Sequence, residues 1–265
     1  MGKVKIGITG RKQNPPAIEA GKNAIMQAME KGAAVEIDTE FMGRGNLRPL
    51  DSGEIAFKPL QKFNSGIVLS FGGDGTLLRT ARDLEKKAII AGINFGRTGF
   101  LQAFHSGEIE KALNAAIAGN ILAEERTRIL TKVDGKKAGE ALNEILIVPA
   151  KAGRILHCQL KIGKDERDEG GDGLIIATPT GSTAHAFSAG GPVIRGNAKV
   201  FVVVSISPTD SRHRPLVVND NGKITVSNFG GKAEAIIDGQ VRVPIRKKIE
   251  LSKGRSIMLA VKPYF

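Results

Sequence analysis

The stretch SFGGDGTLLRTAR, residues 70–82, follows an apolar run at 67–69 and leads into a segment with helical spacing. Three glycines surround a single aspartate, Asp74, at this junction. A Gly-rich loop between a strand and a helix lets backbone N–H groups approach phosphate oxygens, and the helix dipole favours negative charge there. An Asp-Gly turn that caps a helix uses the same residue types. The stretch alone leaves both interpretations open.

Strand and helix patterns alternate on both sides of this stretch. Apolar strands are predicted at 4–9, 33–38, 67–71 and 88–93, and helices at 15–32, 76–87 and 106–120. Residues 39–62 have no clear assignment. Such alternation is typical of an α/β domain with a parallel sheet.

From about Ala123 the pattern changes to short β-rich runs, several of them separated by turn dipeptides such as Asp134-Gly135. This pattern predicts an antiparallel, all-β domain resembling a β-sandwich. We therefore expect an α/β domain at 1–115, carrying the Gly-Gly-Asp-Gly loop, and a β-rich domain at 116–265. The last predicted strand, SIMLAV at 256–261, is assigned to the second domain.

The amino-acid composition restricts the classes of partner that the protein can bind. The 265 residues carry a net charge of +12, but the basic residues are dispersed and no aromatic-interleaved basic platform occurs. This favours a polyanionic small molecule over nucleic acid. The single cysteine, Cys158, excludes an internal disulfide and fits a reducing compartment, so we expect a cytoplasmic protein. No His/Cys spacing typical of zinc and no apolar run of membrane-spanning length is present.

Three further stretches carry polar groups among apolar or Gly-rich residues. Asn143 and Glu144 lie in LNEILI, where one of them could simply face solvent on a half-buried strand. The segment GGDGLIIATPTGSTAHAFSAGGP, residues 170–192, is a strand between two loops rich in Gly, Ser and Thr, which could also stabilise turns. The stretch IIDGQ at 236–240 is, by itself, an ordinary hairpin signal.

Other nucleotide and hydrolase motifs are missing. The chain has no G-x-x-x-x-G-K-[ST] loop, no G-x-G-x-x-G fingerprint and no G-x-S-x-G elbow. The motifs that it does have, in their order and approximate spacing, resemble those of the NAD kinase family. They are GGDGT at 72–76, NFGRTGFL at 94–101, NE at 143–144, GDGLIIATPTGSTA at 171–184, SAGGP at 188–192 and DGQ at 238–240.

The resemblance implies transfer of the γ-phosphoryl of ATP, or of inorganic polyphosphate, to the 2′-hydroxyl of the adenosine ribose of NAD, which gives NADP. It implies Mg²⁺, or another divalent cation, bound with ATP and held mostly by the phosphates, so no metal site on the protein is expected. It further implies an NAD site in a cleft between the two domains and a homo-oligomer, a dimer or tetramer. No nucleic acid or membrane partner is expected.

The motif matches also imply roles for single residues. Asp74 would be the catalytic base, because a ribose hydroxyl is a poor nucleophile and a nearby carboxylate can take its proton. The residues that would bind NAD are Asp74, Gly75, Asn143, Glu144, Asp172, Thr183, Ala184, His185, Ser188 and Gln240. The residues that would bind phosphate or ATP are Gly72, Gly73, Arg79 and Arg154.

Two departures from the family pattern are visible. The family usually has Tyr at the place of His185, and imidazole offers less stacking area to a ring than a phenol does. The chain ends at Phe265, whereas many relatives carry a further C-terminal segment that packs against the first domain. Two alternatives remain: a lipid or sugar kinase that shares the Gly-Gly-Asp-Gly loop, against which the TPTGSTA stretch stands, and an idle NAD-binding regulator, against which the intact Asp74 stands.

Overall fold

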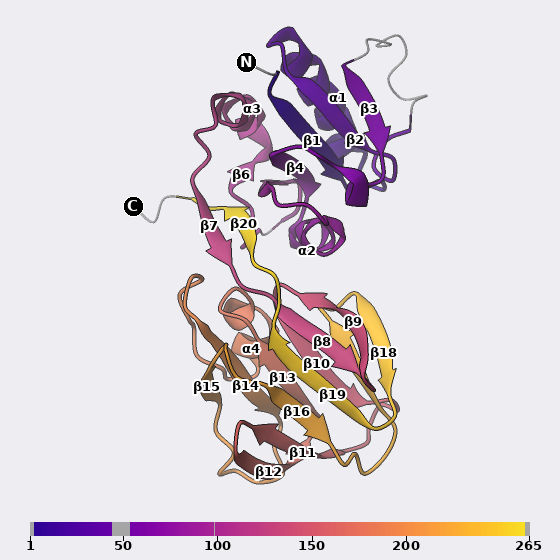
Figure 1. The fold of residues 1–265 in the computed structure, drawn as a ribbon, viewed down its shortest axis with the longest axis vertical. Helices are drawn as coiled ribbons and strands as arrows, with labels where there is room; N and C mark the ends of the chain where they lie inside the picture. Colours follow the sequence, from indigo (N-terminus) through magenta and orange to yellow (C-terminus); the bar gives the residue numbers. More distant parts are fainter. Residues whose placement is uncertain (1–2, 44–53, 98, 263–265) are drawn as a thin grey trace. The chain divides into compact units, whose positions relative to one another are not determined.

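The computed structural model describes residues 3–43, 54–97 and 99–262. Contacts divide the chain into two compact units (Figure 1). The first unit runs from the N-terminus to Glu125 and resumes at Ile257, and the second comprises Arg126–Ser256. This boundary lies ten residues beyond the one predicted at 115/116, and the chain crosses it twice.

The first unit is built on one mainly parallel sheet. Its strands are β1 (Lys5–Gly10), β2 (Ala34–Asp38), β3 (Ile55–Lys58), β4 (Ile67–Gly72), β5 (Ile89–Asn94), β6 (Phe104–His105), β7 (Ala123–Arg126) and β20 (Ile257–Ala260). They run in the order β3-β2-β1-β4-β5-β20-β7, with β6 beside β5. The pairs β1–β2, β1–β4, β2–β3 and β4–β5 are all parallel, which confirms the predicted α/β fold.

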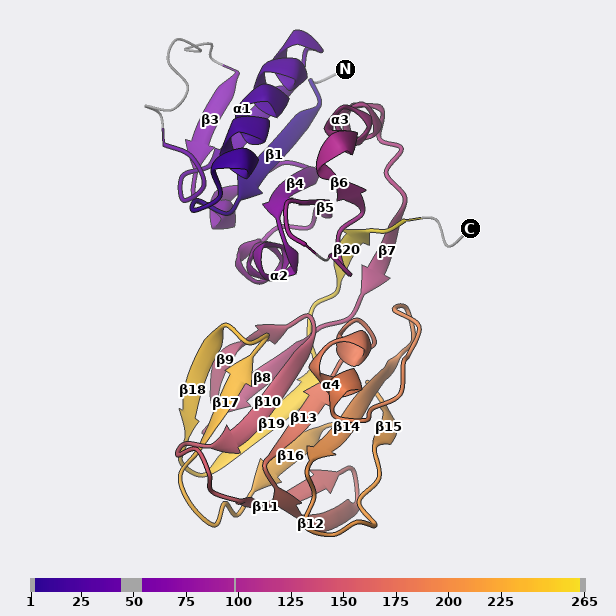
Figure 2. The same ribbon diagram turned by 180° about the vertical axis from the view of Figure 1, so that it is seen from behind.

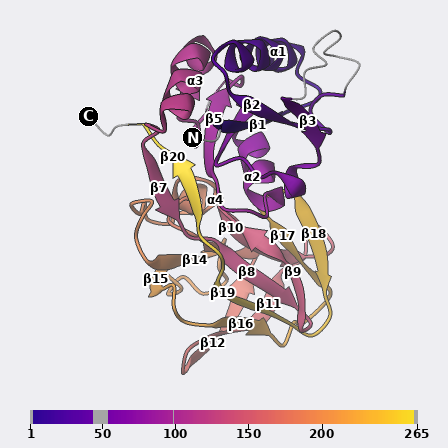
Figure 3. The ribbon, with the colours of Figure 1, turned by 45° about the horizontal axis from the view of Figure 1, so that its top comes forward.

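Three helices cover this sheet: α1 (Pro15–Glu30), α2 (Asp74–Asp83) and α3 (Ile109–Ala118). The helices α1 and α3 share one apolar core with the sheet, and α2 lies against the opposite face (Figure 3). The sequence sets the limits of α1, because the side chain of Asn14 caps its first turn and Gly32 follows its end with φ +78°. Short 3₁₀ turns, η2 (Leu60–Lys62) and η3 (Ser106–Glu108), complete the unit.

The strand β20 corrects the predicted assignment of SIMLAV to the second domain. It pairs in parallel with β5, placing Met258 opposite Ile89 and Leu259 opposite Ile90. Leu259 is buried, and the backbone of Val261 bonds to that of Leu122. An apolar run does not reveal which sheet it joins, because unpaired backbone groups at any sheet edge can accept it. The last strand thus packs against the first unit.

The second unit consists of two antiparallel sheets, visible in Figure 2. One has the order β15-β14-β13-β10-β17-β18 and the other β12-β11-β16-β19-β8-β9. The strands are β8 (Ile129–Val133), β9 (Lys136–Ala141), β10 (Glu144–Pro149), β11 (Leu156–Ile162), β12 (Asp165–Gly171), β13 (Gly173–Ala177), β14 (Val200–Ile206), β15 (Leu216–Asn219), β16 (Ile224–Ser227), β17 (Ala233–Ile237), β18 (Val241–Ile245) and β19 (Lys248–Lys253).

Inward-facing residues of both sheets form one core, which confirms the predicted β-sandwich-like domain. Strand β13 is buried on both faces. Leu174 and Ile176 point into that core, whereas Ile175 and Ala177 pack with Ala186 of the short helix α4 (His185–Ser188). The 3₁₀ turn η4 (Gly181–Thr183) precedes α4. Within the described residues, no helix has the length and apolar character needed to cross a bilayer.

Candidate functional site

The Gly-rich loop of the first unit joins β4 directly to α2. The strand ends at Gly72, Gly73 is the N-cap, and Asp74 is the first residue of the helix, two residues before the predicted start. A Cβ atom on Gly72 would lie 2.3 Å from the hydroxyl oxygen of Thr76, so only glycine fits there. Gly73 is half-buried and Gly75 exposed. The loop therefore presents an acidic side chain at a helix N-terminus, where the dipole stabilises its charge.

The carboxylate of Asp74 is held by the segment that follows β5. Its Oδ2 accepts from the backbone of Phe100 at 3.0 Å, and its Oδ1 from the backbone of Leu101 at 3.1 Å. The amide of Gln102 donates to the same Oδ1 at 3.3 Å. These donors come from the stretch NFGRTGFL and the residue that follows it. Residues 100–102 thus hold the carboxylate of Asp74, the predicted catalytic base.

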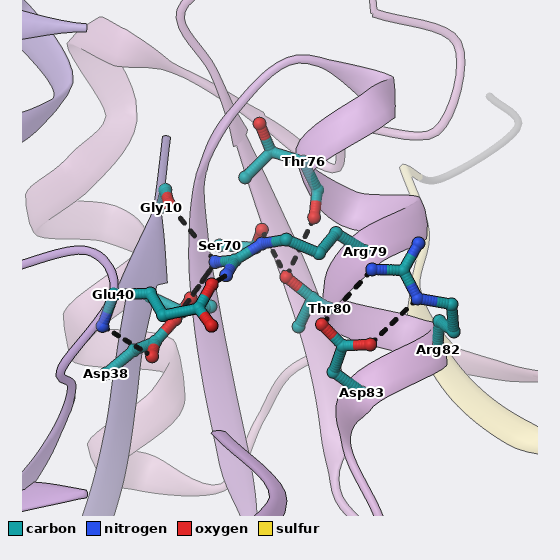
Figure 4. Close-up of polar contacts among 10 residues, drawn as sticks. Gly10, Asp38, Glu40, Ser70, Thr76, Arg79, Thr80, Arg82 and Asp83 are labelled. Atoms are coloured by element: carbon teal, nitrogen blue, oxygen red, sulfur yellow. Dashed lines mark hydrogen bonds and ion pairs between the residues drawn. The ribbon is translucent and has the colours of Figure 1, made fainter. Parts of the chain in front are cut away.

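Arg79, one turn further along α2, is engaged by the carboxyl ends of β1 and β2 (Figure 4). Its Nη2 donates to Asp38 at 2.9 Å, to the hydroxyl of Thr9 at 2.8 Å and to the carbonyl of Gly10 at 3.2 Å. Its Nη1 pairs with the exposed Glu40 at 2.9 Å. Asp38 is 1% exposed, so Arg79 neutralises a buried carboxylate. A phosphate-binding role for Arg79 stays a prediction, since this guanidinium already has acidic partners.

In the second unit, Asn143 lies in the short connection between two strands, and Glu144 is the first residue of the second strand. β9 ends at Ala141 and β10 begins at Glu144. Asp238, between β17 and β18, accepts the backbone N–H groups of Leu142 at 2.9 Å, Asn143 at 2.8 Å and Glu144 at 3.2 Å. We call residues 142–144 the Asn143–Glu144 turn.

The loop after β13 supports the other side of this turn. The backbone of Thr178 donates to the carbonyl of Asn143 at 2.8 Å, and the hydroxyl of Thr178 donates to the carbonyl of Leu142. A Cβ atom on Gly181 would lie 2.2 Å from the carbonyl oxygen of Asn143. The segment TPTG therefore packs so closely against the turn that glycine is required at 181.

Side-chain oxygens at this turn are buried without a partner. Within the described parts of the chain, Asn143 Oδ1, Glu144 Oε2 and Thr180 Oγ1 have no hydrogen-bond partner. Asn143 and Glu144 are each 8% exposed. Burial, together with the negative charge of Asp238, raises the pKa of Glu144 to about 7. Buried polar atoms are normally satisfied, so the unpartnered oxygens on the adjacent residues Asn143 and Glu144 indicate a site for a polar ligand.

The remaining predicted NAD contacts of this segment lie around η4 and α4. Thr183, His185 and Ser188 are exposed, and Ala184 is half-buried. The hydroxyl of Ser182 fixes the loop by donating to the carbonyl of Pro179 at 2.7 Å and accepting from the backbone of Ile194 at 3.0 Å. Ser182 is thus buried and hydrogen-bonded within the loop, whereas the predicted NAD contacts Thr183, His185 and Ser188 are exposed.

Three predicted residues lie elsewhere in the second unit. Asp172 is exposed at the turn between β12 and β13, and Gln240 is exposed directly after the Asp238-Gly239 turn. Arg154 lines a pocket with Lys151, His157 and Lys232. This pocket adjoins Pro149, the far end of β10 from Glu144, about 17 Å away at the rise of a strand. The structure therefore groups Arg154 with other cations and not with the Asn143–Glu144 turn.

Several contributing residues were missed by the sequence analysis. The DGQ motif contains Asp238, but the motif match implies a role only for Gln240. The sequence around Gln102 and Asp38 contains no motif that marks them as site residues, because each forms its hydrogen bond to a residue far away in the sequence. In the described ranges no group of three His, Cys, Asp or Glu side chains is arranged to hold a metal ion.

The Gly-rich loop, the α/β unit and the β-sandwich with its unpartnered polar atoms define a kinase of the Gly-Gly-Asp-Gly type. Two family models match: the ATP-NAD kinase N-terminal domain over residues 22–121 and the ATP-NAD kinase C-terminal domain over residues 142–262. The chain belongs to the NAD kinase family.

Individual relatives agree with this membership. An NAD kinase of Methanothermobacter thermautotrophicus is 33% identical over 253 residues, which cover 94% of this chain and 87% of the relative. An NAD kinase of Thermococcus kodakarensis is 32% identical over 96% of this chain and 91% of the relative. Among solved structures, an NAD kinase from Archaeoglobus fulgidus in complex with ATP is similar with a TM-score of 0.77, 26% identity and coverage of 97% and 93%. Yeast NADH kinase complexed with NADH shares the fold, with a TM-score of 0.87, 21% identity and coverage of 99% and 84%.

Proposed function

We propose that Asp74 is the general base through which this NAD kinase transfers the γ-phosphoryl of ATP to the 2′-hydroxyl of the adenosine ribose of NAD. The observation that carries the proposal is the three-donor cradle around its carboxylate at the start of α2. A carboxylate fixed in this way is oriented before substrate arrives. It takes the hydroxyl proton as the oxygen attacks phosphorus, and ADP leaves with the bridging oxygen.

Recognition of the acceptor is assigned to the second unit. Asn143 and Glu144 would bond to hydroxyl and amide groups of NAD, because their unpartnered oxygens are the buried polar atoms at the Asn143–Glu144 turn. Asp172, Thr183, Ala184, His185, Ser188 and Gln240, with Gly75 of the first unit, are the other proposed NAD contacts. All but the half-buried Ala184 are exposed, so a ligand can reach them.

The donor is proposed to be ATP with Mg²⁺ as part of the substrate. Gly72 and Gly73 would let backbone N–H groups approach its phosphates. Arg79 and Arg154 are the proposed cationic contacts, and Arg79 would have to exchange its exposed partner Glu40 for phosphate. Replacing MgATP by polyphosphate in the same assay tests the alternative donor.

Assembly and location are separate proposals. The two sheets of the second unit end in the edge strands β15, β18, β12 and β9, and uncovered edges favour pairing with another copy. We therefore propose a homodimer or homotetramer, which light scattering distinguishes from a 28.1 kDa monomer. The single, buried Cys158 is consistent with a reducing cytoplasm.

The experiment that tests the proposed base is the substitution Asp74→Asn. We expect the variant to fold and bind NAD like the wild type, because the amide keeps the size of the side chain and the bond lost at the exposed Phe100 can be replaced by water. Its rate of NADP formation should fall by a factor on the order of 10² or more, the effect of losing a general base. A rate within about threefold of the wild type would remove Asp74 from the proton transfer.

A further inference from the structure

We propose that Asp238 is a positioning residue for NAD recognition: its carboxylate fixes the backbone of the Asn143–Glu144 turn, and its negative charge acts on the Glu144 carboxyl that bonds to the ligand. This inference rests on the proposed role of Asn143 and Glu144 in binding NAD. It assigns a function to the first residue of the DGQ stretch, in which the motif match implied a role only for Gln240.

The contacts of Asp238 go beyond what its own hairpin needs. Asp238 and Gly239 have φ values of +48° and +68° and lie in the three-residue connection, residues 238–240, between β17 and β18. Such a turn accepts Asn as readily as Asp and requires no side-chain bond. Here the carboxylate instead reaches the backbone of three successive residues almost a hundred positions away, and the backbone of Asp238 donates to the carbonyl of Glu144 at 3.0 Å.

Only a carboxylate satisfies all three donors. Oδ2 accepts from Leu142 and Oδ1 accepts from both Asn143 and Glu144. An amide would present N–H groups to one side and leave at least one buried N–H group unpaired. With Thr178 bonded to the opposite side of the turn, the backbone is satisfied by protein groups. The side-chain oxygens of Asn143 and Glu144 are left for a ligand.

Burial and a neighbouring charge explain the raised pKa of Glu144. Asp238 contributes a negative charge that opposes a second one on Glu144, and burial acts in the same direction. Arg128, which directly precedes β8, lies within electrostatic reach of Asp238, and its guanidinium also pairs with Glu140 of β9 at 2.8 Å. On the β13 side, Thr178 and Thr180 carry no charge. A protonated carboxyl can donate one hydrogen bond and accept others, which matches the donor and acceptor character of a ribose diol.

A matched control exists in the same unit. Asp134 and Gly135 form another turn with positive φ values, and the carboxylate of Asp134 accepts from the backbone of Arg246, Lys247 and Lys248 at 3.0, 2.8 and 3.0 Å. This turn lies at the opposite end of β9 from the Asn143–Glu144 turn. Asp134→Asn therefore removes the same charge from another hairpin of the same unit without touching the proposed ligand site.

The test measures NAD binding by calorimetry between about pH 6 and about pH 8.5 in the wild type, Asp238→Asn, Glu144→Gln and Asp134→Asn. We expect wild-type affinity to fall about tenfold over this range, with a midpoint near the pKa of about 7 of Glu144. Glu144→Gln should remove the pH dependence. Asp238→Asn should weaken binding at neutral pH by about tenfold and move the midpoint to lower pH, whereas Asp134→Asn should match the wild type.

The outcomes separate this inference from the proposed function. A wild type without pH dependence, or a Glu144→Gln variant that retains it, overturns the inference even if Asp238→Asn does not fold. Equal affinities and midpoints in Asp238→Asn and Asp134→Asn overturn it as well. NMR titration of Glu144 in the ligand-free protein adds a readout independent of NAD: its midpoint should fall in Asp238→Asn. A protein that binds no NAD at all would instead count against the assigned NAD site.

Discussion

The side-chain amide of Gln102 donates to the carboxylate of Asp74, with 3.3 Å between Gln102 Nε2 and Asp74 Oδ1. Gln102 is 4% exposed, and a Cβ atom on Gly92 of β5 would collide with its amide oxygen. Its neighbours therefore hold the side-chain amide of Gln102 in one position. Gln102 orients the proposed base and cannot itself take the proton.

We therefore predict that Gln102→Leu lowers kcat about tenfold while the KM for NAD changes little, because a hydrogen bond to a charged group contributes about 1.5–3 kcal/mol. Steady-state kinetics measure both constants, and thermal unfolding checks that the fold is retained. Gln102→Glu should be worse than Gln102→Leu, since it places a second negative charge beside Asp74. An unchanged kcat in a folded Gln102→Leu variant would contradict the positioning role.

The ion pair of Arg79 and Asp38 predicts a large effect on stability. Arg79→Met leaves the buried Asp38 unpaired, so we expect a loss of about 3 kcal/mol in the free energy of unfolding. The double variant Asp38→Ala with Arg79→Met should lose less than the two single losses added together, because the uncompensated charge is gone. Urea unfolding of the four proteins gives this cycle. Strictly additive losses would mean that the pair is not coupled.

The raised pKa of Glu144 predicts how the free energy of unfolding varies with pH. Its pKa is raised from 4.5 to about 7 in the folded state, so the folded chain holds this proton more tightly than the unfolded chain does. The associated stability is fully present below about pH 4.5 and is lost as the pH rises through about 7. At about 1.4 kcal/mol per pH unit, the full difference is about 3 kcal/mol.

Glu144→Gln, which cannot ionise, should therefore be more stable than the wild type at about pH 8 and similar to it at about pH 4.5. Urea unfolding at the two pH values measures the difference. A constant difference between the two proteins across this range would show that Glu144 titrates normally.

The close packing of Gly181 against the Asn143–Glu144 turn predicts that no side-chain atom can be added at position 181 without cost. In Gly181→Ala the new methyl group would meet the carbonyl of Asn143, and overpacking of this kind costs about 1–3 kcal/mol. We expect lower stability and a raised KM for NAD. Gly222→Ala is the control, because its Cβ atom would come no closer than 3.7 Å to a neighbour. Equal behaviour of the two variants would argue against close packing at the turn.

Local patterns predicted most of the elements, whereas long-range contacts could not be predicted in the same way. The parallel strands β1, β2, β4 and β5 and the helix α2 follow from apolar runs and from the Gly-rich loop, whereas β3 and β6 were not predicted. The placement of β20 beside β5 does not follow from such patterns, because an apolar run fits either sheet. The contacts from Asp38 to Arg79 and from Asp238 to Asn143 join residues 41 and 95 positions apart, for which one sequence contains no pairing signal.

The central claim is that this chain phosphorylates NAD on the adenosine ribose with Asp74 as the base. The most direct measurement incubates the purified protein with NAD and Mg²⁺-ATP labelled on the γ-phosphoryl, and locates the label in the product. We predict labelled NADP with the label on the 2′-phosphate in the wild type, and almost none with Asp74→Asn. Label released only as inorganic phosphate, or transferred equally well by both proteins, would contradict the claim.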